Sequence, residues 1–116
     1  MITLNFREQN IFEMIKSGVK AVETRALNPD EPKRYFGNIG VGDKIELRSV
    51  KTGEILTKEV VRVSIYKSID DFLNREDLSK IFGEPVSKKE AAEKLLSFPG
   101  YEERLEKFGL VALEIR

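Results

Sequence analysis

The sequence predicts an α+β domain in which a small barrel, or a curved and mostly antiparallel sheet of five or six strands, carries helices at its side. Three observations lead to this fold class. Short segments alternate apolar and polar residues, two of them are arranged as a hairpin, and helical spacing is concentrated between residues 68 and 107. The length of 116 residues suits one hydrophobic core, so residues 1–116 are expected to form a single domain.

The first half of the chain reads as strand, helix, strand and loop. "ITLNF" (2–6) alternates apolar and polar side chains, which is typical of a half-buried strand. Residues 8–17 have helical spacing and end at Gly18, and a second strand is expected over 19–25. The segment 26–43 holds two prolines and three glycines among charged residues, so it is predicted to be a long loop.

The second half supplies a hairpin, several helices and a last strand. Residues 44–50 and 54–66 surround the turn "KTGE" and predict two antiparallel strands. Helical spacing recurs across 68–107, where Ser87 opens the capping-box pattern "SKKE". The segment "LVALEI" (110–115) predicts the closing strand.

The composition excludes several kinds of chemistry. The chain has no Cys and no His, which rules out disulfides and thiolate zinc sites and removes the commonest general base. Acidic pairs such as Asp70-Asp71 lack the ligand spacing of a known metal site, so we expect no metal and no cofactor. Twenty basic and twenty acidic residues give zero net charge, so any attraction to nucleic acid must come from a local patch.

The same composition predicts the protein's surroundings. No apolar run approaches the roughly 20 residues that cross a bilayer, and "MITLNFREQN" does not resemble a signal peptide. The cytoplasm is therefore the expected compartment, with no membrane partner. Abundant Lys, Glu and Arg with a single Gln are typical of a thermophile.

The segment "SGVKAVETR" (17–25) carries more charge than a core strand tolerates. On a strand, Glu23 and Arg25 share a face and stand about 6.6 Å apart, whereas Lys20 has the opposite parity. Lys20 joins them only if an irregular turn after Gly18 shifts the register. From spacing alone, a solvent-facing charged strand is the favoured interpretation.

A family resemblance changes that interpretation. "SGVKAVETR" resembles the GxKxxExR signature of the ASCH domain (activating signal cointegrator homology), a branch of the PUA-like superfamily, with Gly18, Lys20, Glu23 and Arg25 at its fixed positions. "IGVGDKIEL", "VVRVSIYKSIDDFL" and "YEERLEKFGLVALEI" agree in order, so the similarity spans nearly the whole chain. The resemblance implies a PUA-like β-barrel with flanking helices and a cleft beside the motif that binds RNA or nucleotides.

The residue types suit such a cleft. Lys20 offers a compact cation for a phosphate or a carbonyl, and Arg25 offers a planar fork for bidentate contacts. Glu23 can hold Arg25 in an ion pair or accept a hydrogen bond from a base amino group. With the resemblance added, we expect Lys20, Glu23 and Arg25 to line the main cleft and to bind RNA or a nucleotide-like ligand there.

Two tyrosines join the candidate ligand-binding residues. Tyr35 belongs to the run "KRYF" (33–36), and basic residues beside aromatic ones can bind single-stranded nucleic acid. An ordinary loop anchored to the core by an aromatic ring explains the same run equally well. Tyr66 stands between a strand and a helix, where its ring is expected in the core while its hydroxyl can reach a cleft.

Alternative functions stay open. One branch of the family resembles amidohydrolases of acylated, N4-acetylcytidine-like nucleosides, with a motif lysine, a threonine nucleophile three residues later and a downstream glutamate. Here Glu23 occupies the nucleophile position and Thr24 follows one residue later, on the other strand face. Lys20 and Glu23 would then be the catalytic pair, and a lysine-dependent ribonuclease or a protein-interaction domain are further alternatives.

Overall fold

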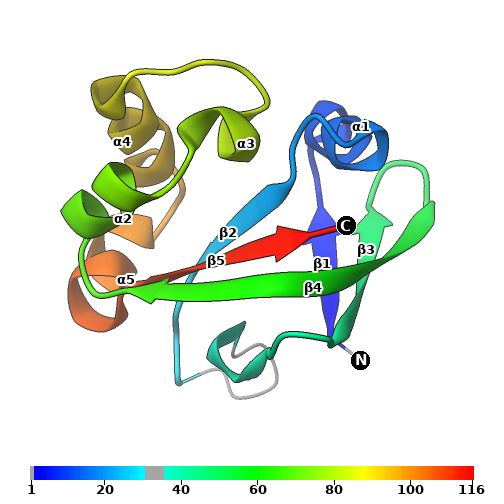
Figure 1. Cartoon of the computed structure of the whole chain (residues 1–116), viewed down its shortest axis with the longest axis horizontal. Helices are drawn as coiled ribbons and strands as arrows, with labels where there is room; N and C mark the ends of the chain where they lie inside the picture. The colour runs from blue at the N-terminus through cyan, green and yellow to red at the C-terminus, as the bar shows by residue number, and fades with distance from the viewer. Residues whose placement is uncertain (1, 31–35) are drawn as a thin grey trace.

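The computed structural model of the protein describes residues 2–30 and 36–116. The strands and α-helices, in chain order, are β1 (Thr3–Phe6), α1 (Gln9–Ser17), β2 (Val22–Ala26), β3 (Lys44–Ser49), β4 (Ile55–Tyr66), α2 (Ile69–Arg75), α3 (Leu78–Phe82), α4 (Lys88–Leu96), α5 (Tyr101–Phe108) and β5 (Leu110–Ile115). The sheet curls into a half-barrel, with α1 at one end and α2 to α5 gathered at the other (Figure 1). This confirms the predicted α+β class with a curved sheet and flanking helices.

The strands form one five-stranded sheet in the order β1-β3-β4-β5-β2. β1 runs parallel to β3, whereas the other three neighbouring pairs are antiparallel, and β3 and β4 make the predicted hairpin. The last strand, β5, lies between β4 and β2. The order leaves β1 and β2 as the two edges of the half-barrel, and the motif residues Glu23 and Arg25 lie on an edge strand.

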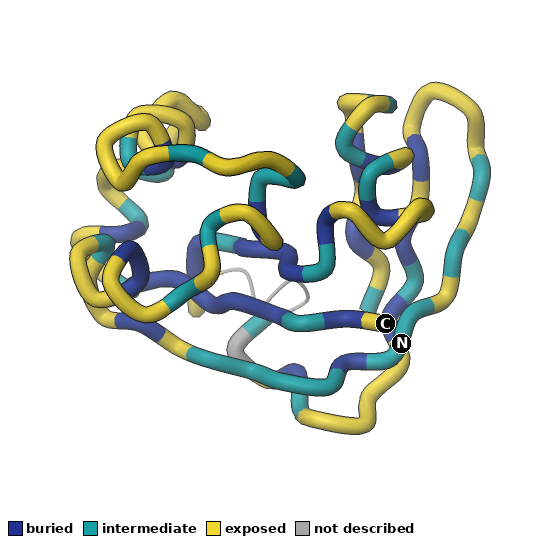
Figure 2. Tube along the Cα trace, turned by 45° about the horizontal axis from the view of Figure 1, so that its top comes forward, coloured by how far each residue is buried: buried dark blue, intermediate teal, exposed yellow. Residues whose placement is uncertain are grey.

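The sheet buries apolar side chains on both faces of β5. Val111 and Leu113 belong to the core inside the half-barrel, together with residues of α1. Leu110 and Ala112 belong to a second core against α2 to α5. This period-two alternation explains why β5 is buried along almost its whole length, as is β2 (Figure 2). By contrast, the turn that joins β3 to β4 is exposed (Figure 2).

A β-bulge in β4 changes which face its residues occupy. Val60 pairs with Ile115 and Arg62 pairs with Glu114, so one extra residue stands between them on β4. Val60 therefore packs inside the half-barrel, while Arg62 lies on the face that meets the helices. The bulge places a charged side chain at the boundary between the sheet and α2.

The helices at the second face are short, and α2, α3 and α4 each begin at a side chain that caps them. Ser87 accepts a hydrogen bond from the Glu90 N–H at the start of α4 while the Glu90 carboxylate accepts from the Ser87 N–H, which confirms the predicted capping box. Ser68 caps α2 through the Asp71 N–H. Within residues 2–30 and 36–116, no helix combines the length and apolarity needed to span a membrane.

Candidate functional site

Lys20 lies in an irregular turn between α1 and β2. Gly18 ends α1 in the left-handed region at φ 87°, and its N–H donates to Ile15 O at 3.1 Å. The Lys20 N–H then donates to Met14 O at 3.0 Å, and regular strand pairing begins only at Val22. The strand is thus shorter than predicted at its start, and the irregular turn frees Lys20 from strand parity.

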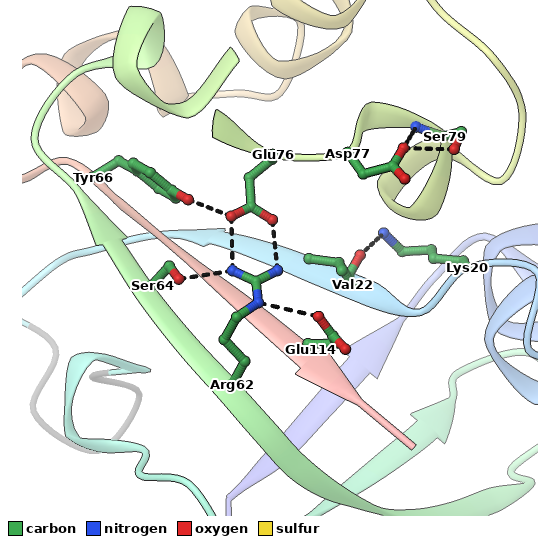
Figure 3. A network of polar contacts seen from close by, with 9 residues as sticks. All are labelled: Lys20, Val22, Arg62, Ser64, Tyr66, Glu76, Asp77, Ser79 and Glu114. Atoms are coloured by element: carbon green, nitrogen blue, oxygen red, sulfur yellow. Dashed lines mark hydrogen bonds and ion pairs between the residues drawn. The ribbon is translucent and has the colours of Figure 1, made fainter. Parts of the chain in front are cut away.

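The Lys20 ammonium donates a hydrogen bond to a backbone carbonyl on the free edge of β2. Ala21 O accepts from Ile115 N–H on β5, so the next carbonyl, that of Val22, faces away from β5. Lys20 Nζ donates to Val22 O at 2.7 Å (Figure 3) and to Ile81 O in the last turn of α3 at 2.6 Å. Lys20 therefore links the edge of β2 to α3.

The Glu23 carboxylate accepts a hydrogen bond from the next free backbone N–H at the edge of β2, and it lies close to both motif cations. The carboxylate accepts from the Thr24 N–H at 2.8 Å, lies 3.6 Å from Lys20 Nζ and 3.4 Å from Arg25 Nη2. The Lys20 and Glu23 side chains are only 7% and 8% exposed. The predicted Glu23–Arg25 ion pair is present, and the burial of Lys20 and Glu23 excludes a solvated charged strand.

Arg25 reaches from β2 to the opposite edge of the half-barrel. Its Nη2 lies 3.5 Å from the carbonyl oxygen of Asn5, and its guanidinium carbon lies 5.2 Å and 5.8 Å from the ring centroids of Phe6 and Phe36. Its side chain is 23% exposed, the most of the three motif charges. We call Asn5, Phe6, Arg25 and Phe36 the seam.

The hydrogen bonds of Arg25 leave donors to spare. Both polar contacts come from Nη2 and are long, with Glu23 Oε2 at 3.4 Å and Asn5 O at 3.5 Å. A guanidinium has five N–H groups, and within the described part of the chain Nε and Nη1 of Arg25 have no hydrogen-bond acceptor. These donors are the feature of the motif that a ligand can use.

Burial and charge shift the pKa values of the buried pair. Burial lowers the pKa of Lys20 below its ordinary value, although the Glu23 carboxylate acts in the opposite direction. Burial raises the pKa of Glu23, but the charges of Lys20 and Arg25 and the hydrogen bonds to its carboxylate outweigh burial, so its pKa is also lowered. Glu23 is therefore ionised at neutral pH.

The lowered pKa of Glu23 predicts acid sensitivity. Because its folded pKa lies below its unfolded pKa, the stabilisation is present above the unfolded value and is lost as pH falls through the folded one. Glu23→Gln is expected to lower the free energy of unfolding at pH 7 and to flatten its fall from about pH 5 downward. Urea denaturation at several pH values measures this, with Glu93→Gln on the exposed face of α4 as control. Parallel curves for wild type and Glu23→Gln would contradict it.

Sequence reasoning missed a second polar cluster on the helix side of the sheet. Arg62 donates from Nη1 and Nη2 to the Glu76 carboxylate at 2.8 Å each, and Tyr66 donates its hydroxyl proton to the same carboxylate (Figure 3). Arg62 also donates to Glu114 at 3.1 Å and to Ser64 at 2.7 Å. The cluster fastens the end of α2 to β4 and β5.

This cluster explains the position of Tyr66. It also shows why Arg62 and Glu76 were not predicted from the sequence. The Tyr66 ring packs edge-on against Phe72 at 5.7 Å, in the core as expected, and its hydroxyl is engaged by Glu76. Burial raises the pKa of Tyr66. Arg62 and Tyr66 lie an even number of positions apart on β4, and this spacing indicates that they share a strand face. Glu76 follows the end of α2, and only the tertiary fold brings it to the other two residues.

The remaining candidates fall outside the seam. Tyr35 lies outside the described residues, although Phe36 of the same run packs at the seam. Thr24 is buried on the face opposite to Glu23. A half-open hollow of ≈ 320 Å³ has no motif residue in its lining, which is Ile2, Asn38, Ile39, Asp43, Lys44 and Ile45. Over residues 2–30 and 36–116, no three acidic residues are placed to hold a metal ion.

Comparisons with known proteins establish the fold. No protein-family model and no curated protein matches the chain. The crystal structure of the hypothetical protein PH0355 is similar, with a TM-score of 0.73, 27% identity, and coverage of 98% of this chain and 95% of that one. The solution structure of protein PF0455 from Pyrococcus furiosus has a TM-score of 0.68 and 24% identity, covering 99% of this chain and 94% of its own. The chain thus shares a full-length α+β half-barrel fold with these two proteins.

Proposed function

We propose that the protein binds single-stranded RNA or a nucleotide-like ligand at the seam, with Arg25 as the contacting residue. The observation that carries this proposal is the state of the Arg25 guanidinium. Its Cζ lies 5.2 Å from the ring centroid of Phe6 and 5.8 Å from that of Phe36, its side chain is partly exposed, and Nε and Nη1 have no acceptor within the described part of the chain. A planar cation with spare donors suits bidentate contact with a phosphate or a base edge.

Lys20 and Glu23 have a different role in this proposal from the one their charges first suggest. Lys20 Nζ is committed to two carbonyls, and the Glu23 carboxylate is committed to the Thr24 N–H and to both cations. They are positioning residues: Lys20 fixes Glu23, and Glu23 fixes Arg25. The GxKxxExR pattern then describes one contacting residue and the pair that orients it.

The charge of the whole chain limits the kind of ligand. With twenty basic and twenty acidic residues, the protein has no general field that attracts a long duplex. One arginine at the seam neutralises few phosphates, so the dependence of affinity on salt should be shallow. A short single strand or a nucleotide fits this footprint better than double-stranded nucleic acid.

Arg25→Ala is expected to weaken binding of a fluorescent single-stranded RNA of about eight nucleotides by about 1–3 kcal/mol, because a charge-assisted contact is lost. Arg25→Lys should lie between wild type and alanine, since an ammonium cannot make the bidentate contact. Fluorescence anisotropy at two salt concentrations measures both effects. Arg75→Ala, at the exposed end of α2, is the matched control. Equal affinities for Arg25→Ala and Arg75→Ala would reject the proposal.

Hydrolysis of an acylated nucleoside has one observation in its favour. Burial lowers the pKa of Lys20, as a general base requires. Against it, Nζ already donates to two carbonyls, and Thr24 lies on the face opposite to Glu23. Incubation of the protein with N4-acetylcytidine and with short RNAs tests it, and turnover that is lost in Lys20→Ala would favour an enzyme over a binding module.

A further inference from the structure

An aromatic and basic surface stands where α5 begins. Phe98 is 41% exposed, and its ring lies 5.2 Å from the ring of Tyr101 at an interplanar angle of 49°. Arg104 follows Tyr101 by three residues and so shares its side of α5. We call Phe98, Tyr101 and Arg104 the α5 surface. An exposed aromatic ring beside a cation is the combination that single-stranded nucleic acids use for base stacking and phosphate contact.

The α5 surface adjoins the seam across the free edge of β2. α5, which begins at Tyr101, packs against β2, the strand that carries Arg25. Burial raises the pKa of Tyr101, while the positive charge of Arg25 and the Ala26 N–H act in the opposite direction. The packing of α5 on β2 thus brings Tyr101, with Phe98 beside it, close to the strand that carries Arg25.

The Arg104 side chain lies against the start of α5. Its guanidinium folds back toward the start of α5, with Cζ 3.7 Å from the position that a Cβ would take at Gly100. In the described part of the chain, no carboxylate forms an ion pair with Arg104. The position is unfavourable for a cation, because helix N-termini carry partial positive charge. An anion bound beside Arg104 would relieve this repulsion.

In the described part of the chain, the acidic residues of α5 form no ion pair with Arg104. Glu102 and Glu103 follow Tyr101 by one and two positions, which turns them about 100° and 200° around the helix axis. The Glu103 carboxylate accepts from Lys107 Nζ at 2.9 Å, on the solvent side of α5. The hydrogen bond from Lys107 and, to a smaller extent, the charge of Arg104 lower the pKa of Glu103, so Glu103 and Arg104 interact without direct contact.

We propose that the α5 surface extends the seam and holds a second nucleotide of a single strand. Phe98 stacks on the base of that nucleotide, and Arg104 contacts the phosphate that joins it to the nucleotide at Arg25. This inference rests on the proposed function of the seam. The binding site then extends beyond the GxKxxExR motif, and it binds oligonucleotides more tightly than single nucleotides.

Phe98→Ala is expected to weaken binding of the eight-nucleotide RNA roughly five-fold or more, which is the effect of losing one stacked base. Leu96→Ala is the matched control, because Leu96 is also 41% exposed and lies two residues away. Phe98→Trp should preserve binding, since indole stacks at least as well as phenyl. A thermal melt of each variant checks that folding is unchanged.

Arg104→Gln is expected to weaken the same RNA and to reduce the slope of log affinity against log salt by about 0.7, the single-strand value for one phosphate contact. Arg75→Gln serves as control. A 5′-mononucleotide such as CMP provides the second probe, because it reaches only the seam. Its affinity should fall in Arg25→Ala and stay unchanged in Phe98→Ala and Arg104→Gln.

The two proposals fail in different ways. If Arg25→Ala weakens the RNA while Phe98→Ala and Arg104→Gln behave like Leu96→Ala and Arg75→Gln, the α5 surface is not part of the site and the seam remains. If Phe98→Ala weakens CMP and RNA equally, the α5 surface does not hold a second nucleotide, and the inference is overturned. If wild-type protein binds neither probe, both proposals are overturned.

Discussion

Replacing Gly109 with alanine is expected to lower the free energy of unfolding by about 3–5 kcal/mol, because backbone strain and a steric overlap add together. Gly109 joins α5 to β5 at φ 79° and ψ −163°, a region that residues with a Cβ avoid. A Cβ there would lie 2.2 Å from the carbonyl oxygen of Tyr66, a backbone atom that cannot rotate away. Relief would require β5 to shift against β4 at the Tyr66–Leu110 pair.

Comparing the free energies of unfolding of Gly109→Ala and Gly53→Ala by chemical denaturation isolates the cost of the steric overlap with Tyr66. Gly53 also has a positive φ, 75°, but no atom lies within 4 Å of its would-be Cβ. Gly53→Ala should therefore cost only about 1 kcal/mol, the strain of a left-handed alanine. Similar losses for the two variants would show that the contact with Tyr66 is relieved without cost.

Lys20→Met is expected to destabilise the fold by about 3–5 kcal/mol, the usual result of removing one partner from a buried ion pair. The substitution keeps most of the side-chain volume and removes the ammonium. Glu23 would stay buried with the Thr24 N–H and only the long ion pair to Arg25, and the carbonyls of Val22 and Ile81 would lose the Lys20 donor. The side-chain link that Lys20 makes between β2 and α3 would be lost with them.

Two further variants test whether the ion pair causes this loss. Lys16→Met removes an exposed lysine paired with Glu54 at 2.7 Å, and it should leave the free energy of unfolding nearly unchanged. Lys20→Met combined with Glu23→Gln should be less destabilised than the sum of the single variants, because the unpaired buried charge is then absent. A Lys20→Met protein as stable as Lys16→Met would contradict the structural role of Lys20.

Local patterns in the sequence predicted the elements of the fold well. Alternation in "ITLNF", the hairpin around "KTGE" and the capping box at Ser87 each depend on residues close together in the chain, and each appears in the structure. The pairing of the strands was not predictable in this way. The parallel pairing of β1 with β3 and the place of β5 between β4 and β2 join segments far apart in sequence.

The sequence also predicted which motif charges meet, but not how deeply they are buried. Lys20, Glu23 and Arg25 form one network, and the Glu23–Arg25 ion pair was expected from their shared strand face. Their burial follows from β2 being an edge strand, whose free N–H and C=O groups need partners that β5 does not supply. Spacing alone could not reveal this edge, because a strand with two neighbours has the same period.

The β-bulge likewise limited what the sequence could predict about the second polar cluster. Val60 and Arg62 differ by two positions, so an unbroken strand would place them on one face. The bulge separates them and turns Arg62 toward Glu76, which no local pattern indicates. The basis of the Arg62–Glu76–Tyr66 cluster is therefore the tertiary fold.

The most direct test of the central claim is a titration of ¹⁵N-labelled protein with a short single-stranded RNA, followed through the arginine Nε–H signals. If Arg25 contacts the ligand, its Nε–H signal shifts in a saturable way, together with the backbone amides of Phe6 and Phe36. Arg62 provides an internal reference, because its Nε already donates to Glu114 at 3.1 Å, and its signal should stay in place. An Arg25 signal that does not move at saturating RNA, or a shift at Arg62 alone, would contradict the assignment of the seam as the binding site.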